Sequence, residues 1–165
     1  MSNNNKTEHD KINQPGKLDK IFFYPKEFYV FDNFSSFMVK YKDYLWPTAE
    51  HAYQASKFLG VAPSIVNKIK KAKSAHDAQK IANQNKHLQI KNWDNIKTKV
   101  MKKILIQKVK QHPYVLKKLI ESGNREIIED SWRDSNWGWG QNKNGNNLLG
   151  KLWEEVRDDF KNYKL

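Results

Sequence analysis

The sequence of 165 residues contains no cysteine, and this absence excludes several kinds of site. A chain without cysteine has no disulfide scaffold, no thiol nucleophile and no thiolate ligand for zinc. The histidines lack the i, i+4 pairing that puts two metal ligands on one helix face; they are His9, His51, His76, His87 and His112. The sequence therefore predicts no metal site and no cofactor.

Long apolar runs are also missing. No stretch approaches the roughly 20 apolar residues of a membrane span, and the polar N-terminal segment has no apolar region like that of a signal peptide. We therefore expect a soluble, cytoplasmic protein without a membrane partner. With 38% hydrophobic residues, a chain of this length favours a single domain.

Arginine is scarce although the net charge is +12, since only Arg125, Arg133 and Arg157 carry a guanidinium group. Basic surfaces attract phosphates and nucleic acid, but bidentate recognition of phosphates and bases favours arginine over lysine. The many lysines, asparagines and isoleucines are equally typical of a codon bias toward A and T. The charge thus permits a phosphorylated ligand without requiring one.

The pattern of hydrophobic residues predicts a mainly helical α+β domain over residues 21–165, preceded by a disordered polar tail over residues 1–20. Aromatic and β-branched residues between Ile21 and Trp46 predict short antiparallel strands in the segments IFFY, EFYVF and SFMVKYKDYLW. A further short strand is expected at Ile127-Ile128. Helices are expected at 48–59, 63–71, 74–83, 94–111 and 113–121, and again after a cap at Asn146 or Asn147.

The segment WPTAEHAYQASKF, residues 46–58, carries an unusual polar stripe. In a helix that begins at Thr48, four side chains share one face, namely Glu50, Tyr53, Gln54 and Lys57. The stripe is either an ordinary solvent-exposed helix side or the wall of a site. Small residues on the other faces favour the wall, because they allow close packing there.

The segment SWRDSNWGWG, residues 131–140, combines three tryptophans with two glycines. The glycines exclude a regular helix, and at least one indole is expected to be accessible for stacking on a nucleobase. The glycines also allow backbone N–H groups to approach a phosphate just before the last predicted helix. The alternative is a hydrophobic lid that seals the core.

Four segments together resemble the NADAR, or YbiA-like, family over roughly Ile21 to Phe160. They are FDNFSSF, WPTAEHAYQASKF, KNWDNIKTKVMKKILIQK and LIESGNREIIEDSWRDSNWGWGQNKNGNNLLGKLWEEVR. The last contains the family's Asp-x-x-Trp-Gly-x-Gly and Gly-x-Asn-x-Leu-Gly patterns. The sequence departs from the family at 91–93 and 83–85, where arginines are common. Members are N-glycosidases associated with NAD, ADP-ribose and riboflavin-pathway intermediates.

The resemblance implies an N-glycosidase that hydrolyses the N-glycosidic bond of a ribosyl-phosphate or ADP-ribosyl substrate. Candidate substrates are ADP-ribosylated guanine, including that in DNA and other nucleic acid, and intermediates of riboflavin biosynthesis. The expected catalytic residues are Glu50, Lys57 and Asp134. The expected substrate-binding residues are Trp46, Tyr53, Gln54, Trp93, Trp137, Gly138, Gly140 and Asn147.

The chemistry of N-glycosidic bond cleavage explains what such residues would do. Cleavage develops positive charge at the anomeric carbon, which a carboxylate of Glu50 or Asp134 stabilises. A desolvated Lys57 amine can instead form a Schiff base with the opened sugar. Two alternatives stay open: a non-catalytic module that binds ADP-ribose or nucleotides, and an interaction domain in which the tryptophans are core.

Overall fold

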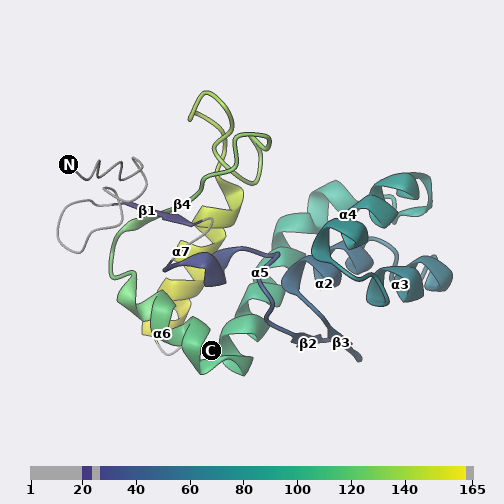
Figure 1. The fold of residues 1–165 in the computed structure, drawn as a ribbon, viewed down its shortest axis with the longest axis horizontal. Helices are drawn as coiled ribbons and strands as arrows, with labels where there is room; N and C mark the ends of the chain where they lie inside the picture. The colour runs from purple at the N-terminus through teal and green to yellow at the C-terminus, as the bar shows by residue number, and fades with distance from the viewer. Residues whose placement is uncertain (1–19, 24–26, 163–165) are drawn as a thin grey trace, which may run out of the picture. The chain divides into compact units, whose positions relative to one another are not determined.

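The computed structural model describes residues 20–23 and 27–162 of the chain (Figure 1). These residues form two compact units, one containing residues up to Asp32 and from Lys117 onward, and the other spanning Asn33–Leu116. The predicted tail, residues 1–20, lies outside the described residues except for Lys20, where the first strand begins. None of the described helices is long and apolar enough to cross a membrane.

The unit formed by the two ends of the chain is built on a parallel strand pair. Strand β1 (Lys20–Phe23) pairs with β4 (Glu126–Glu129), and Ile21 lies opposite Ile127. The short strand expected at Ile127-Ile128 is confirmed. The antiparallel pairing expected for β1 is wrong, because its partner comes from a distant part of the chain and runs in the same direction.

The segment EFYVF, predicted as a strand, instead contains the 3-10 helix η1 (Tyr29–Phe31). The N–H of Phe31 donates to the Phe28 carbonyl at 3.0 Å, and the rings of these two residues stack 5.7 Å apart. Aromatic residues three positions apart come together on a 3-10 turn but not on a strand. Val30 and Phe31 are buried in succession, without the alternation of a strand.

Helix α7 (Leu148–Lys161) packs against β4 in the same unit (Figure 1). Its indole Trp153 lies 4.8 Å from the Phe31 ring, and its Nε1 donates to the Phe31 carbonyl at 2.9 Å. The predicted apolar stripe is buried at Leu149, Leu152, Trp153 and Val156, whereas Phe160 is half-buried.

Asn147 holds the predicted position before α7, but it does not cap the helix with its side chain. Its backbone is left-handed, with φ at +49°. The side-chain Oδ1 accepts the N–H of Glu129 at 3.0 Å, and Nδ2 donates to the carbonyl of Ile127 at 2.8 Å. The amide therefore satisfies the backbone of β4 in place of a neighbouring strand, and the predicted cap is wrong in mechanism.

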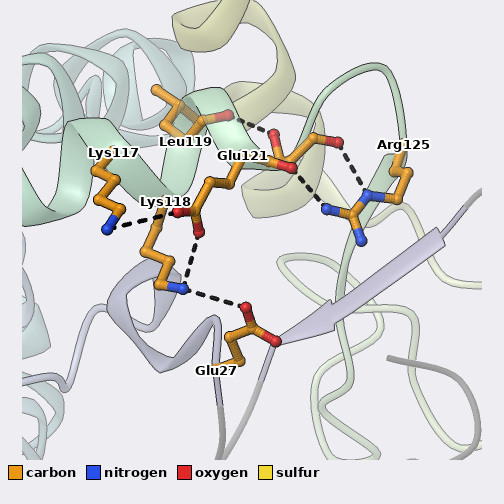
Figure 2. Close-up of polar contacts among 7 residues, drawn as sticks. Glu27, Lys117, Lys118, Leu119, Glu121 and Arg125 are labelled. Carbon is orange, nitrogen blue, oxygen red and sulfur yellow. Dashed lines mark hydrogen bonds and ion pairs between the residues drawn. The ribbon is translucent and has the colours of Figure 1, made fainter. Parts of the chain in front are cut away.

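Helix α6 (Pro113–Glu121) ends where the sequence predicted, at Ser122-Gly123, with φ of Gly123 at +62°. Figure 2 shows the polar contacts at this end. Lys118 donates to Glu121 at 2.8 Å and to Glu27 at 3.1 Å, and the Arg125 guanidinium donates to the Glu121 carbonyl at 2.6 Å. The Arg125 contact satisfies a carbonyl that the helix end leaves without an intrahelical partner, and the Lys118 contacts are ion pairs with two side-chain carboxylates.

The unit spanning Asn33–Leu116 begins with an antiparallel hairpin of β2 (Val39–Tyr41) and β3 (Tyr44–Trp46), as predicted. Val39 and Tyr41 are buried while Lys40 is exposed, which confirms the alternation in this segment. Four helices follow, with the short 3-10 helix η2 (Lys86–Leu88) after the third. They are α2 (Ala49–Ser56), α3 (Pro63–Lys70), α4 (Ala75–Gln84) and α5 (Trp93–Gln111).

The predicted caps of α2 and α4 are present. The Thr48 side chain accepts the N–H of His51, and the Ser74 side chain accepts the N–H of Asp77. The Asp77 carboxylate accepts the Ser74 hydroxyl at 2.7 Å and so does not pair with a backbone donor. Helix α2 ends three residues before the predicted Leu59, because the backbone tightens into a turn there.

Helix α5 carries most of the predicted apolar stripe. Ile104, Leu105 and Val109 are buried, whereas Ile96 and Val100 are half-buried. One lysine departs from the expectation that lysines lie on the opposite face: Lys108 is fully buried and its Nζ donates to Ser35 at 2.8 Å. The mainly helical α+β class is confirmed.

Candidate functional site

The polar stripe of α2 does not face open water. Glu50, Tyr53 and Gln54 are 5%, 6% and 3% exposed, and Lys57 at the end of the helix is half-buried. A charged carboxylate is almost never buried without compensating contacts. The reading of this stripe as an ordinary solvent-exposed helix side is therefore excluded.

Two hydrogen bonds hold Glu50, one through its backbone and one through its carboxylate. Its backbone N–H donates to the carbonyl of Asn33 at 3.0 Å, which ties the start of α2 to the segment before β2. Its Oε1 accepts a hydrogen bond from Gln54 Nε2, one turn further along the helix, at 2.7 Å. The bond from Gln54 restricts the orientation of the carboxylate.

The Lys57 amine lies against two aromatic rings. Its Nζ is 5.4 Å from the ring centre of Tyr53 and 5.9 Å from that of Trp93, and the two rings lie 5.1 Å apart. Trp93 is the first residue of α5 and is 4% exposed. The carbonyl of Lys57 accepts the N–H of Ile90 at 2.9 Å, which holds the approach to α5 beside the end of α2.

Burial lowers the pKa of Lys57 below the ordinary value for lysine. The charge of Glu50 opposes this effect, Lys86 and Lys97 reinforce it, and Asp94 opposes it more weakly. Desolvation disfavours the ammonium form, so a larger fraction of the amine is neutral near pH 7 than in an exposed lysine. A neutral amine is the nucleophilic form.

Trp46 is fully buried, and its Nε1 donates to the Tyr41 carbonyl at 3.2 Å. Its ring lies 5.1 Å from that of Tyr44 on the same hairpin. This predicted substrate-binding residue therefore supports the hairpin that leads into α2.

Asn33 is a site candidate that sequence reasoning missed. It belongs to FDNFSSF, which was used only for the family resemblance. Its side chain is 6% exposed, and its backbone carbonyl contacts Glu50 directly. A polar residue among phenylalanines was the available signal, because an asparagine in such surroundings is rarely placed there for packing alone.

In the other unit, Asp134 organises the loop between β4 and α7. Its Oδ1 accepts the N–H groups of Asn136 and Trp137, both at 2.8 Å. This is a local side-chain-to-backbone turn that fixes the position of the Trp137 backbone. Trp137, Gly138, Gly140 and Asn147 belong to the same loop.

The glycines allow backbone segments of this loop to pass very close to each other. A Cβ atom on Gly138 would lie 2.8 Å from the Glu129 carbonyl oxygen, and one on Gly145 would lie 2.5 Å from that of Ser135. Gly140 has φ at +70°. The N–H of Gly140 donates to the Ser131 carbonyl, and the N–H of Asn147 donates to the Gly138 carbonyl. These two donors are therefore already hydrogen-bonded within the loop.

The three indoles of the loop differ in exposure. Trp132 is 63% exposed, with the Arg133 guanidinium 4.6 Å from its ring centre, which confirms that at least one indole is accessible. Trp139 donates from Nε1 to Asp130 at 2.8 Å and lies 4.8 Å from the Phe22 ring. Trp137 is half-buried. The loop thus combines an accessible indole with one that packs on β1.

Comparisons with known proteins agree with this architecture. The NADAR domain matches residues 21–161. The chain belongs to the NADAR family. A relative named N-glycosidase in Nostoc punctiforme is 33% identical and is aligned over 86% of this chain and 93% of its own length.

The NADAR fold extends over both units. The NMR structure of YbiA from E. coli superposes with a TM-score of 0.80 at 30% identity, covering 90% of this chain and 89% of that one. The riboflavin biosynthesis protein PYRR of Zea mays is 33% identical over 81% of this chain and 23% of its own length. Family membership and these names support an N-glycosidase-type enzymatic activity for this chain.

Proposed function

We propose that this NADAR protein hydrolyses the N-glycosidic bond of a ribosyl-phosphate or ADP-ribosyl substrate. The observation that carries the proposal is the buried cluster on α2 and α5, in which an oriented carboxylate and a desolvated amine lie beside two aromatic rings. The cluster consists of Glu50, Tyr53, Gln54, Lys57 and Trp93.

Glu50 stabilises the positive charge that develops at the anomeric carbon as the bond to the base nitrogen breaks. Electrostatic stabilisation of this kind is strongest where the carboxylate is fixed and shielded from water, as it is here. The departing base keeps the electron pair of the broken bond and takes up a proton. Water then supplies the hydroxyl group of the released sugar.

Lys57 allows a second, covalent mechanism of bond cleavage in the same cluster. The anomeric carbon first loses its bond to the ring oxygen, which takes up a proton, and a double bond forms to the base nitrogen. The neutral Nζ adds to this carbon and passes a proton to the base nitrogen, which departs with the electron pair of its broken bond and leaves a protonated Schiff base between lysine and sugar. Water hydrolyses the Schiff base and returns the free amine. Burial, which lowers the pKa of Lys57, supports this role, and the rings of Tyr53 and Trp93 lie beside the amine.

Asp134 and Trp137 stay predicted catalytic and substrate-binding residues, on the strength of the family pattern that they match. The hydrogen bonds of Asp134 to the loop backbone give it a positioning role for Trp137 as well. Gly138, Gly140 and Asn147 enter the proposal as the residues that shape this loop. Trp46 does not, because it is fully buried in the hairpin.

The test is release of free base from an ADP-ribosylated guanine nucleotide and from a nucleotide-like intermediate of riboflavin synthesis, followed by chromatography. Glu50→Gln and Lys57→Ala should each lower turnover at least about 100-fold without unfolding the protein. Lys80→Ala, on the exposed side of α4, is the matched control. Unaltered rates in both site variants refute the proposal.

Lys57→Arg separates the covalent route from an electrostatic one. Arginine keeps the positive charge but forms no Schiff base, so the covalent route predicts loss of turnover in this variant too. Borohydride added during turnover should attach the sugar to the wild-type protein at Lys57, as mass spectrometry would detect. Tight binding of ADP-ribose with no product from either substrate favours the non-catalytic binding module.

A further inference from the structure

Two residues that contact Glu50 each carry a buried acceptor oxygen without a hydrogen-bond donor. The two oxygens are Oε1 of Gln54 and Oδ1 of Asn33, and neither accepts a hydrogen bond from the described part of the chain. The two residues are 3% and 6% exposed. Buried polar atoms are nearly always paired in native proteins, so an unpaired one calls for an explanation.

The other contacts of each amide fix the direction of its oxygen. Gln54 Nε2 donates to the Glu50 carboxylate at 2.7 Å, and a flipped amide would place two oxygens against each other. Asn33 Nδ2 lies 3.5 Å from the Met101 sulfur, which accepts hydrogen bonds weakly. In both residues the oxygen is therefore the end that is left for another partner.

Both residues are bonded directly to Glu50, one through its backbone carbonyl and the other through its side-chain amide. The unpaired oxygens thus belong to two residues that contact Glu50, whose carboxylate the proposed function places beside the anomeric carbon. An acceptor oxygen pairs with O–H or N–H groups and repels the oxygens of a phosphate. The groups that suit it are the hydroxyls on the sugar carbons next to the anomeric carbon.

We propose that Gln54 and Asn33 accept hydrogen bonds from the 2- and 3-hydroxyls of the substrate ribose. The site then selects ribosyl substrates and rejects deoxyribosyl ones, since a missing hydroxyl leaves a buried acceptor unpaired. This inference rests on the proposed N-glycosidase function and adds to it a choice of sugar. It also makes Asn33 a specificity-determining residue.

The test measures binding by calorimetry for two sets of sugars. One set is ADP-ribose and its analogues that lack the 2- or the 3-hydroxyl of the terminal ribose. The other is ribose 5-phosphate and 2-deoxyribose 5-phosphate. Wild-type protein should bind the deoxy members at least about tenfold more weakly than the parent compounds.

Two variants assign the discrimination to its residues. Gln54→Met and Asn33→Leu keep the side-chain volume but remove the acceptor, so each should bring the affinity ratio for one hydroxyl close to one. Asn33→Leu also leaves the backbone bond to Glu50 intact. Gln84→Met and Asn83→Leu make the same changes on the exposed part of α4 and should keep the wild-type ratios.

The outcomes separate this inference from the proposed function. Equal binding of parent and deoxy compounds by the wild-type protein overturns the inference alone, and so does discrimination that persists unchanged in both variants. Binding of neither ADP-ribose nor ribose 5-phosphate overturns it together with the proposed substrate classes. Because the wild-type comparison needs no variant, a variant that fails to fold does not remove the test.

Discussion

Replacing Gly150 with alanine should destabilise the protein more than any other single added methyl group at the turn into α7. Gly150 lies in the first turn of the helix, where it packs against β4. An added Cβ would overlap the Ile127 carbonyl oxygen and would approach Nδ2 and Oδ1 of Asn147 to 2.5 Å and 2.6 Å. The substitution therefore pushes the helix away from the strand and disturbs the amide that completes the backbone bonding of β4.

The size of the effect follows from these contacts. Overpacking against backbone costs about 1–3 kcal/mol, and the two Asn147 hydrogen bonds contribute about 1 kcal/mol each. The better helix propensity of alanine returns up to about 1 kcal/mol. We expect a net loss of about 3 kcal/mol, which lowers the melting temperature of a chain of this length by about 6–12 °C.

Urea unfolding followed by tryptophan fluorescence measures this loss, with Gly60→Ala as the control. Gly60 has φ at +82° and nothing within 4 Å of an added Cβ, so its replacement costs only the left-handed conformation, about 1 kcal/mol. If Gly150→Ala is as stable as the wild type, or no less stable than Gly60→Ala, then the close contact of Gly150 with the β4 backbone is not as described.

Three further predictions concern single side chains. His51 is buried between Thr48 and Ala72, and burial lowers its pKa below 6.5. Because the unfolded chain then takes up a proton more readily than the folded protein, the free energy of unfolding should fall as the pH drops below about 6.5. An equal pH dependence of the stability of His51→Gln would contradict this. Asp134→Ala should disorder the Trp137 backbone and shift the tryptophan fluorescence. Asp134→Asn should keep the loop structure but lose turnover if the negative charge is needed for catalysis. Full turnover of Asp134→Asn would remove Asp134 from the set of catalytic residues. Lys118→Met should lower the free energy of unfolding, measured in urea, by about 1 kcal/mol or less, because the acidic partners of Lys118 are half-exposed. This loss of stability should be smaller in 1 M salt. A loss that does not depend on salt would mean that the ion pairs are not its cause.

The local elements of this protein could be predicted from the sequence because their signals are local. Thr48 and Ser74 cap helices with their own side chains, and Gly123 ends α6 because it tolerates a positive φ. The order of Glu50, Gln54 and Lys57 along one helix face was equally visible, since three- and four-residue spacing sets which side chains share a face.

Strand partners and side-chain environments could not be predicted in the same way, because they depend on residues far apart in the sequence. The parallel partner of β1 is β4, and the amide of Asn147 bonds to β4 when its sequence position indicated a helix cap. Neither pairing leaves a pattern within one segment. Asn33 was missed for the same reason, as its bond to Glu50 joins two different segments.

The order of the residues was enough to predict the positions of most helices, the caps of α2 and α4, the family and the residue types of the candidate site. Long-range packing was needed to show that the stripe on α2 is buried, that burial lowers the pKa of Lys57 beside two aromatic rings, and that Oε1 of Gln54 has no hydrogen-bond donor in the described part of the chain. The physical reason is that spacing along a helix fixes the direction of a side chain, whereas burial and pKa depend on what the rest of the chain packs against it.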